Sequence, residues 1–251
     1  MTRHIVLWKQ LMIPGITALV GAGGKTTVLS KLVSYGQLIG KETMVSSTTK
    51  MYESQVVTWD PYYGDNLAEA ETYCTSAMER KGYAAWFHSV ANTKVIGLRG
   101  EYIDTIHRKH PQWHIVVEAD GAKEKWLTAH KRIEPVIPTM TRRTIGVVNL
   151  QILNQTLTPF YIHNLPLLLQ LLDVPVGTAM TPDLLARFVG HEHGLFQYAK
   201  GDYILFCTGA DTVDKEKIHN FIALLPTTIT MIVLAKGYEE DCQIDKVIQW
   251  H

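Results

Sequence analysis

The segment LVGAGGKTT, residues 19–27, constrains the fold of this chain more than any other stretch of the sequence. An apolar run of strand length, residues 16–20, leads into the glycines, and residues 26 to about 36 follow with the apolar spacing of a helix. A glycine-rich turn between a strand and a helix lets backbone N–H groups curl around an anion, and the helix N-terminus adds its positive end. The segment therefore predicts an anion-binding loop within an α/β fold.

The loop departs from both standard phosphate-binding patterns. The pattern G-x-x-x-x-G-K-[ST] needs a glycine five positions before Gly24, and the chain has Leu19 there. The dinucleotide pattern G-x-G-x-x-G/A starts at Gly21 but meets Thr26 at its third glycine. A second strand, residues 44–47, ends in SSTTK without the acid that would bind a ribose hydroxyl. A tight turn with a surface lysine is the plain alternative, but we favour a shortened phosphate loop that binds a nucleotide.

The residue types of this loop predict separate roles for its members. Lys25 is expected to reach phosphate oxygens, and the Thr26 hydroxyl is expected to bind Mg²⁺. Lys25 is also predicted to serve in catalysis. The nucleotide-binding residues that we predict in the loop are Gly21, Ala22, Gly23, Gly24, Lys25, Thr26 and Thr27.

A nucleotide loop with Mg²⁺ needs an acidic partner, and IVVEADG supplies one directly after a buried strand, residues 115–117. Asp120 falls just past the strand end, the place expected for an acid that supports the metal. Glu118 lies two residues earlier, so strand alternation puts both carboxylates on the same side. The alternative is an Asp-Gly turn beside a solvated glutamate. We predict both acids as catalytic residues, and Asp120 as a metal ligand together with Thr26.

Two threonines end the neighbouring strand. Thr48 and Thr49 are candidates to sense the terminal phosphate or to orient water. Threonines at strand ends are common, so a purely structural role is the equal alternative. Thr48 completes the predicted catalytic set.

Apolar strands alternate with helical patterns along the whole chain, and this order predicts an α/β fold with a mostly parallel sheet and helices on both faces. In such sheets ligands bind at the carboxyl ends of strands, where the glycine loop and IVVEADG lie. No composition break marks a linker, so we expect one domain over residues 1–251. Residues 151 to about 195 carry helical patterns and fewer strand signals, which predicts a small helical appendage.

The composition limits the classes of partner. Lys and Arg number 24, as do Asp and Glu, so no charge excess favours nucleic acid or an anionic membrane. The three cysteines are widely separated and form no C-x-x-C pair, which fits a reducing compartment and argues against a thiolate metal site. The N-terminal stretch is apolar but interrupted by charges, and it has neither the pattern of a secretory segment nor the length to span a bilayer. We expect a cytoplasmic protein.

Five short segments extend this interpretation to a family. VGAGGKTT, STTKM, VVEADGAK, EPVIP and HEHGL follow one another in the order seen in YqeC-like proteins, so the chain resembles that family over most of its length. Those proteins are described as accessory factors for selenium-dependent molybdenum hydroxylases, with a fold that looks like a P-loop NTPase with deviant Walker motifs. The resemblance implies a three-layer sandwich, nucleotide binding at the glycine loop, metal support from Asp120, and a molybdenum hydroxylase or its cofactor as a partner.

One segment differs from the family pattern. Members often carry an Asn-Lys-x-Asp-like segment after a late strand, as guanine-reading GTPases do, and the matching segment here is CTGAD, residues 207–211. Asp211 is kept and is predicted to contact the base, whereas Thr208 and Gly209 replace two other members of the pattern. The lysine that would pack over the base is absent, which leaves both ATP and GTP open as ligands. LAKG, residues 234–237, either flanks the base or forms a plain loop.

Two further signals have plain alternatives. The basic loop, residues 123–135, is either a solvated loop or an anion-binding or partner-docking loop over the nucleotide. His191 and His193 project together from an extended segment, but the sequence offers no third ligand nearby, so we favour a surface or helix-capping role over a metal site. No Ser-His-Asp order and no context for a cysteine nucleophile is visible.

These observations lead to two main classes of function. The first is a Mg²⁺-dependent NTPase that couples hydrolysis of ATP or GTP to maturation or delivery of a molybdenum cofactor. The second is a sensor that binds a nucleotide or a molybdopterin dinucleotide and hydrolyses little of it. A small-molecule kinase or nucleotidyltransferase is a third option. Slow phosphate release stimulated by a partner would favour the first class, and tight binding without turnover would favour the second.

Overall fold

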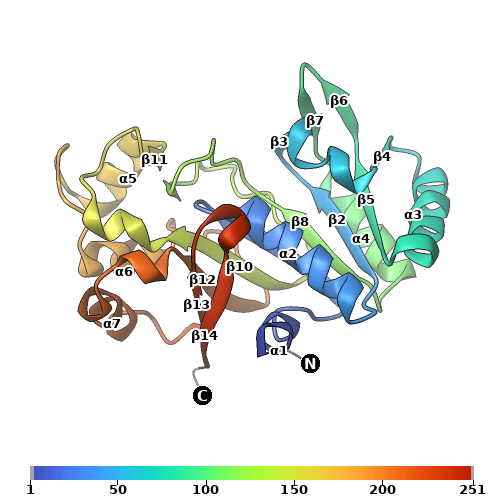
Figure 1. Cartoon of the computed structure of the whole chain (residues 1–251). Coiled ribbons are helices and arrows are strands. Elements are labelled where there is room, and N and C mark those ends of the chain that lie inside the picture. Colours follow the sequence, from blue (N-terminus) through green and yellow to red (C-terminus); the bar gives the residue numbers. More distant parts are fainter. Residues whose placement is uncertain (1–2, 250–251) are drawn as a thin grey trace. The chain divides into compact units, whose positions relative to one another are not determined.

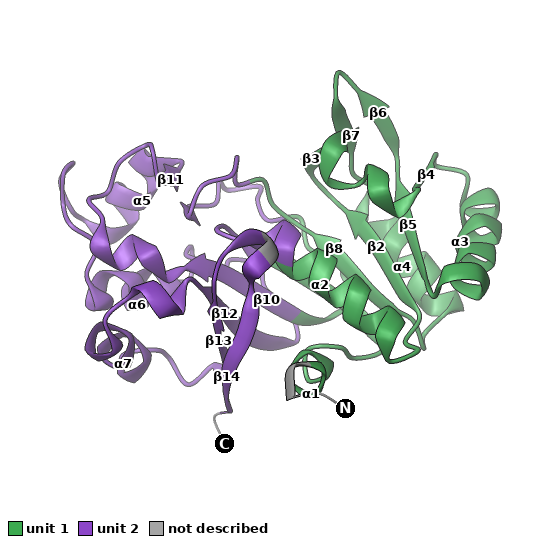
Figure 2. Ribbon diagram, in the orientation of Figure 1, with its two compact units in different colours: residues 1–19, 28–121, 136–143 green, residues 20–27, 122–135, 144–251 purple. Residues whose placement is uncertain are grey.

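The structure is a computed structural model that describes residues 3–249, apart from the side chains of residues 3, 4 and 240. The chain forms two compact units, each built from several segments (Figure 2). Unit 1 comprises residues 1–19, 28–121 and 136–143. Unit 2 comprises residues 20–27, 122–135 and 144–251, so the glycine loop belongs to unit 2.

The regular elements of the first half of the chain are α1 (Arg3–Lys9), β1 (Gly15–Gly21), α2 (Lys25–Leu38), β2 (Thr43–Ser47), β3 (Lys50–Tyr52), η1 (Glu53–Gln55), η2 (Val57–Trp59), β4 (Tyr62–Tyr63), α3 (Leu67–Lys81), β5 (Tyr83–Phe87), β6 (Ser89–Ala91), β7 (Lys94–Ile96), α4 (Gly100–Lys109) and β8 (His114–Glu118). The second half contains β9 (Leu127–Thr128), β10 (Thr141–Asn149), η3 (Leu150–Asn154), β11 (Ile162–His163), α5 (Leu165–Leu172), α6 (Pro182–Gly190), β12 (Asp202–Thr208), η4 (Ala210–Thr212), α7 (Lys215–Ala223), β13 (Ile229–Lys236), η5 (Glu239–Asp241) and β14 (Gln243–Gln249).

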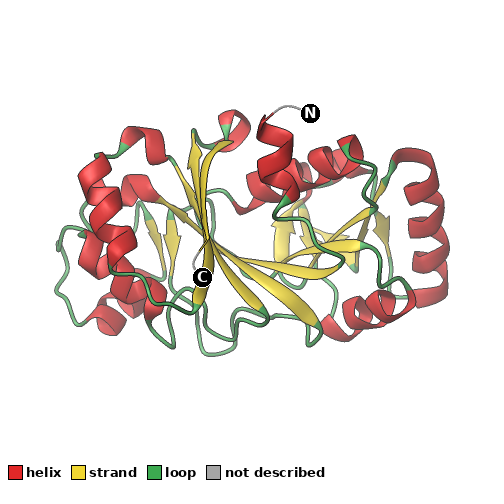
Figure 3. Ribbon diagram, turned by 90° about the horizontal axis from the view of Figure 1, so that it is seen from below, coloured by secondary structure: helices red, strands yellow, loops and turns green. Residues whose placement is uncertain are grey.

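The central sheet has nine strands in the order β14-β13-β12-β10-β1-β8-β2-β5-β4, with helices beside the strands (Figures 1 and 3). Strand β8 pairs in parallel with β1 and β2, β5 pairs in parallel with β2 and β4, and β12 pairs in parallel with β13. Strand β14 adds an antiparallel edge. The predicted α/β fold, a P-loop NTPase-like sandwich around a mostly parallel sheet, is confirmed.

Unit 1 aligns the carboxyl ends of three neighbouring strands. In the parallel pairing of β1 with β8, Leu19 lies opposite Glu118, and in the pairing of β2 with β8, Ser47 lies opposite the same residue. The glycine loop continues directly from β1, and IVVEADG continues from β8. The apolar cluster beneath these strands includes Ile16, Met44 and Ile115, all fully buried.

Unit 1 also contains a three-stranded sheet, in the order β3-β7-β6. The turn between β6 and β7 is made by Asn92 and Thr93, which both have positive φ angles, of +49° and +63°. Positive φ angles at both central residues are typical of the two-residue turns whose twist matches that of the flanking hairpin strands.

The core of unit 2 is a second cluster of buried apolar side chains, which includes Val148, Phe188, Leu205 and Ile232. The residues predicted as a helical appendage, 151 to about 195, lie in this unit and contain η3, α5 and α6. Helix α6 begins as its sequence indicates, because the Thr181 side chain accepts a hydrogen bond from Leu184 N at 3.2 Å and proline occupies the first helical position. Within residues 3–249, no helix has both the length and the apolar character needed to cross a membrane.

Candidate functional site

The glycine loop joins β1 to α2, and its backbone depends on glycine. Gly21, Gly23 and Gly24 have φ angles of +92°, +81° and +134°, which residues with a Cβ atom rarely adopt. Between them, the Ala22 N–H donates to the Val147 carbonyl oxygen at 2.9 Å and ties the loop to β10. The 14-residue helix α2 begins immediately afterwards at Lys25. Strand, glycine loop and helix thus stand in the predicted order.

The ends of β10 and β12 pack so closely against Gly23 and Gly24 that neither position has room for a side chain. A methyl group on Gly23 would lie 2.5 Å from Asn149 Cβ and 2.9 Å from the Trp126 carbonyl oxygen. A methyl group on Gly24 would lie 2.9 Å from Thr208 Cγ2. These separations are well below the roughly 3.5–4.0 Å of a favourable carbon contact. Packing therefore requires glycine at both positions, in addition to the backbone angles.

Lys25 is buried at the start of α2, with 5% of its surface exposed. Its Nζ donates to the Gly21 carbonyl oxygen at 2.5 Å, so the ammonium group lies against the first residue of the loop. A buried ammonium group needs hydrogen-bond acceptors, and anionic phosphate oxygens are stronger acceptors than carbonyl oxygens. Thr26 and Thr27 follow Lys25 and are half-buried. The loop therefore combines a buried cation, hydroxyl groups and a helix N-terminus.

Two buried polar residues at the loop, Asn149 and Thr208, were not assigned to the site from the sequence. Thr208 Oγ1 donates to the Gly23 carbonyl oxygen at 2.6 Å. Asn149 Oδ1 accepts from Gln151 N at 2.9 Å and so closes the end of β10. Each is a polar residue at the end of an apolar strand, and this pattern was visible in the sequence around both positions. Only the packing shows that both strand ends lie against the glycine loop.

Asp211 holds the LAKG segment through its carboxylate. Its Oδ1 accepts a hydrogen bond from Gly237 N at 2.7 Å, and the Gly209 N–H donates to the Gly237 carbonyl oxygen at 3.0 Å. CTGAD and LAKG therefore lie side by side, at the ends of β12 and β13. Asp211 itself is exposed on the short turn η4. One of the two carboxylate oxygens of Asp211 thus accepts a hydrogen bond from the backbone of the neighbouring LAKG segment.

We expect weak discrimination between ATP and GTP, with Asp211→Ala narrowing whatever GTP preference exists. A single carboxylate-to-base hydrogen bond contributes roughly 1.5–3 kcal/mol, which supports about a tenfold to a hundredfold preference. Competition binding of the two nucleotides measures the ratio. Asp211→Asn is the matched control, because it keeps an oxygen acceptor for Gly237 N and removes the charge. A GTP preference above about a thousandfold that survives Asp211→Ala would show that the base is read elsewhere.

The predicted acids and Thr48 come together in unit 1, at the carboxyl ends of β8 and β2. Glu118 and Asp120 are 7% and 1% exposed, which excludes the alternative of a solvated glutamate beside an exposed turn. The Thr48 N–H donates to the Glu118 carbonyl oxygen at 3.0 Å, and the Thr48 hydroxyl donates to the Val136 carbonyl oxygen at 2.6 Å. The two acids are therefore buried, one at the last residue of β8 and one two residues beyond it.

The basic loop is held in unit 2 by the turn that follows α6. Buried Gln197 donates from Nε2 to the carbonyl oxygens of Lys131, at 2.9 Å, and of Glu134. The buried His130 Nδ1 lies 3.1 Å from the carbonyl oxygen of Gly194. Hydrogen bonds therefore join the basic loop, residues 123–135, to the turn that follows α6. These contacts give both segments a structural role.

The histidines after α6 and the buried cysteines are residues that could carry metal or thiol chemistry. His191 Nδ1 accepts from His193 N at 3.0 Å in the turn just after α6. Among the side chains that the structure describes, which leave out those of residues 3, 4 and 240, no three of His, Cys, Asp or Glu converge as a metal site of that kind requires. Burial raises the pKa of Cys74 to about 12 and also raises the pKa of Cys207. Both thiols therefore stay protonated and unreactive at neutral pH.

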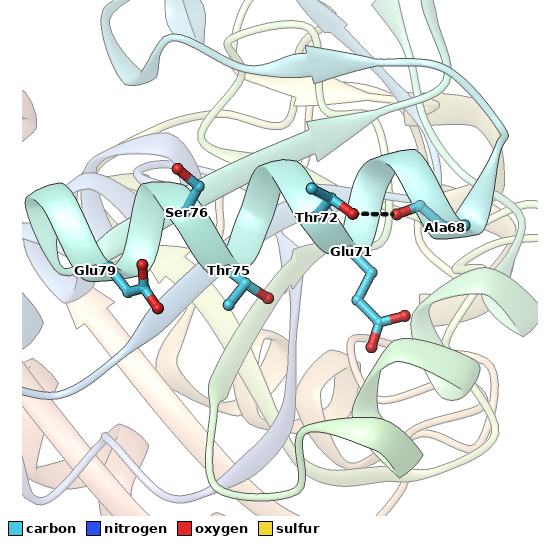
Figure 4. A pocket seen from close by; sticks show the side chains of 6 residues that line it. All are labelled: Ala68, Glu71, Thr72, Thr75, Ser76 and Glu79. Atoms are coloured by element: carbon cyan, nitrogen blue, oxygen red, sulfur yellow. Dashed lines mark hydrogen bonds between the residues drawn. The ribbon is translucent and has the colours of Figure 1, made fainter.

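A hollow of about 500 Å³ lies on the surface of α3 (Figure 4). All of the side chains that line it come from this one helix, and the hydrogen bond drawn there, from Thr72 Oγ1 to the Ala68 carbonyl oxygen at 2.9 Å, is internal to the helix. The hollow contains none of the residues predicted to bind a nucleotide. We assign no function to it.

Comparison with known proteins identifies the family. The family described as "YqeC protein" matches residues 17–166, more than half of the 251 residues. The chain belongs to the YqeC family. The matched YqeC region runs from β1 into α5 and includes the glycine loop, the buried acids and the basic loop, whereas Thr208 and Asp211 lie beyond it.

A relative from Escherichia coli (strain K12) agrees with this membership. The chain is 29% identical over 192 residues to the "Uncharacterized protein YqeC" of that organism. The alignment covers 73% of this chain and 71% of the relative. The resemblance predicted from five short segments is therefore confirmed as membership of the YqeC family.

Proposed function

We propose that this YqeC-family protein binds the phosphates of a nucleoside triphosphate at the glycine loop. The observation that carries the proposal is the buried Lys25 ammonium group, 2.5 Å from the Gly21 carbonyl oxygen in a loop with three glycines at positive φ. Phosphate oxygens accept hydrogen bonds from such an ammonium group and from backbone N–H groups at the same time. The N-terminus of α2 adds a partial positive charge.

Mg²⁺ is the metal that this chemistry implies, and the residues present fit it. We propose the Thr26 hydroxyl of unit 2 and, by itself, the Asp120 carboxylate of unit 1 as candidate ligands, because each is an oxygen group of the kind that Mg²⁺ takes. Bound Mg²⁺ neutralises charge that develops on transferred phosphates. Asp120 is 1% exposed in unit 1. Glu118 and Thr48 are our candidates for orienting a water molecule.

We further propose that hydrolysis of ATP or GTP serves the maturation of a selenium-dependent molybdenum hydroxylase. The support for this role is the description of YqeC-like proteins as accessory factors for such enzymes. A nucleotide sensor that hydrolyses little and a kinase or nucleotidyltransferase are the competing functions. The hydroxylase or its cofactor is the partner that this role requires.

Equilibrium titration with ATP and GTP, with and without Mg²⁺, tests the proposal when phosphate release is measured in the same samples. We expect at least one triphosphate to bind, binding to strengthen with Mg²⁺, and slow release of phosphate. Tight binding without release would assign the protein to the sensors instead. If neither nucleotide binds under any of these conditions, the phosphate-loop function is wrong.

The role of Asp120 has its own test. Asp120→Asn is expected to weaken Mg²⁺-dependent binding or turnover far more than binding measured in EDTA, because the amide keeps the shape of the side chain but loses the charge that holds a cation. Titrations with and without metal measure the difference. Asp173→Asn, at an exposed aspartate after α5, is the control for loss of one negative charge. Equal losses in both conditions would remove Asp120 from the metal site.

A further inference from the structure

Thr208 makes the one side-chain hydrogen bond described for the Gly23 carbonyl oxygen in residues 3–249, and it is well placed to control that peptide group. The residue is fully buried at the end of β12. Its Oγ1 lies 2.6 Å from the Gly23 carbonyl oxygen and 3.5 Å from the Val148 carbonyl oxygen. A hydroxyl group has a single proton to donate, so the shorter contact takes it.

This hydrogen bond also sets the direction of a neighbouring N–H group. A trans peptide is planar, so the Gly23 carbonyl oxygen and the Gly24 N–H point in opposite directions. Because the Gly23 carbonyl oxygen points toward Thr208, the Gly24 N–H points away from Thr208 and the end of β12. The proposed anion would accept from the Gly24 N–H on that side.

Without this hydrogen bond, the peptide group between Gly23 and Gly24 would have little preference for one orientation over the other. Gly23 and Gly24 both have positive φ angles here, and glycine adopts negative φ about as readily. A rotated peptide would turn the carbonyl oxygen toward the anion, which loses one N–H donor and places a negative end beside the phosphates. The Thr208 hydrogen bond opposes that rotation.

We propose that Thr208 is a positioning residue, which locks the Gly23–Gly24 peptide in its anion-binding orientation without touching the anion. This inference rests on the proposed function at the glycine loop. The residue after Thr208, Gly209, donates from its N–H to the Gly237 carbonyl oxygen of LAKG at 3.0 Å. The end of β12 thus connects the glycine loop to LAKG.

Binding of Mg²⁺-ATP and of inorganic tripolyphosphate to Thr208→Val and Thr208→Ser tests the inference. Valine keeps the shape of threonine and removes the hydroxyl, and we expect it to weaken both ligands by the same factor, about tenfold or more, since one charge-assisted donor is lost. Serine keeps the hydroxyl and should restore most of the affinity. The Gly24 amide signal in ¹⁵N NMR spectra should shift or broaden in the valine variant only, a change that a general loss of stability does not produce.

The possible failures are distinguishable. Wild-type affinity in a folded valine variant, together with an unchanged Gly24 signal, would overturn the positioning role. The proposed function would still stand if removing the Lys25 ammonium group abolished binding in the same assay. If the valine variant does not fold, Thr208→Cys against Thr208→Ser carries the test, because a thiol of similar size is a weak donor. Equal affinities of those two variants would likewise overturn the inference.

Discussion

Lys25→Met is expected to weaken the binding of ATP or GTP by about a hundredfold or more. A charge-assisted hydrogen bond contributes roughly 1.5–3 kcal/mol, so two bonds from this ammonium group to phosphate oxygens contribute about 3 kcal/mol or more, at ~1.4 kcal/mol for each factor of ten. Methionine fills nearly the same volume as the buried lysine stem and carries no charge. The fold should survive, because methionine keeps the packing of the buried side chain and leaves the backbone bond from the Ala22 N–H to the Val147 carbonyl oxygen in place. Calorimetric titration measures the loss.

The control for this variant is Lys215→Met, at an exposed lysine that begins α7 in the same unit. It removes the same charge from the protein and should leave affinity unchanged, so it separates local binding from the overall electrostatic attraction of an anion. An unchanged affinity in Lys25→Met would end the phosphate-loop interpretation. A loss of similar size in both lysine variants would assign the effect to net charge.

Gly23→Ala is expected to abolish most nucleotide binding, and Gly40→Ala is its matched control. Both glycines have positive φ, of +81° and +67°, so both substitutions incur the roughly 1–2 kcal/mol cost of a left-handed residue. They differ in their surroundings, because a methyl group on Gly40 would meet nothing within 4 Å, whereas on Gly23 it would lie 2.5 Å from Asn149 Cβ. The loop must therefore move in Gly23→Ala, and its N–H groups move with it.

Urea unfolding and nucleotide titration of the two glycine variants separate stability from binding. We expect Gly40→Ala to lower the free energy of unfolding by about 1 kcal/mol and to bind nucleotide as the wild type does. We expect Gly23→Ala to lose a factor of at least about ten in affinity, equivalent to one charge-assisted donor. Normal binding by Gly23→Ala would mean that the ligand does not use the backbone of this loop.

Local signals in the sequence were sufficient to predict the α/β fold and the glycine loop. The apolar runs and the glycines each act over a few residues, so the order of strand, loop and helix around Gly21 and Lys25 is determined by neighbours in the chain. The strand that precedes Asp120 was predicted in the same way. The resemblance to the YqeC family came from five such short segments, and the match over residues 17–166 confirmed it.

The tertiary structure alone decided which polar groups meet. The hydrogen bond from Thr208 to Gly23 joins residues 185 positions apart, and the bond from Gln197 to Lys131 joins residues 66 positions apart. Apolar periodicity indicates which side of a strand is buried, but it carries no information on which strand end lies beside a given loop. That depends on strand order and on how each segment returns to the sheet. For this reason the sequence was sufficient to predict the glycine loop, whereas only the packed chain shows which residues lie against it.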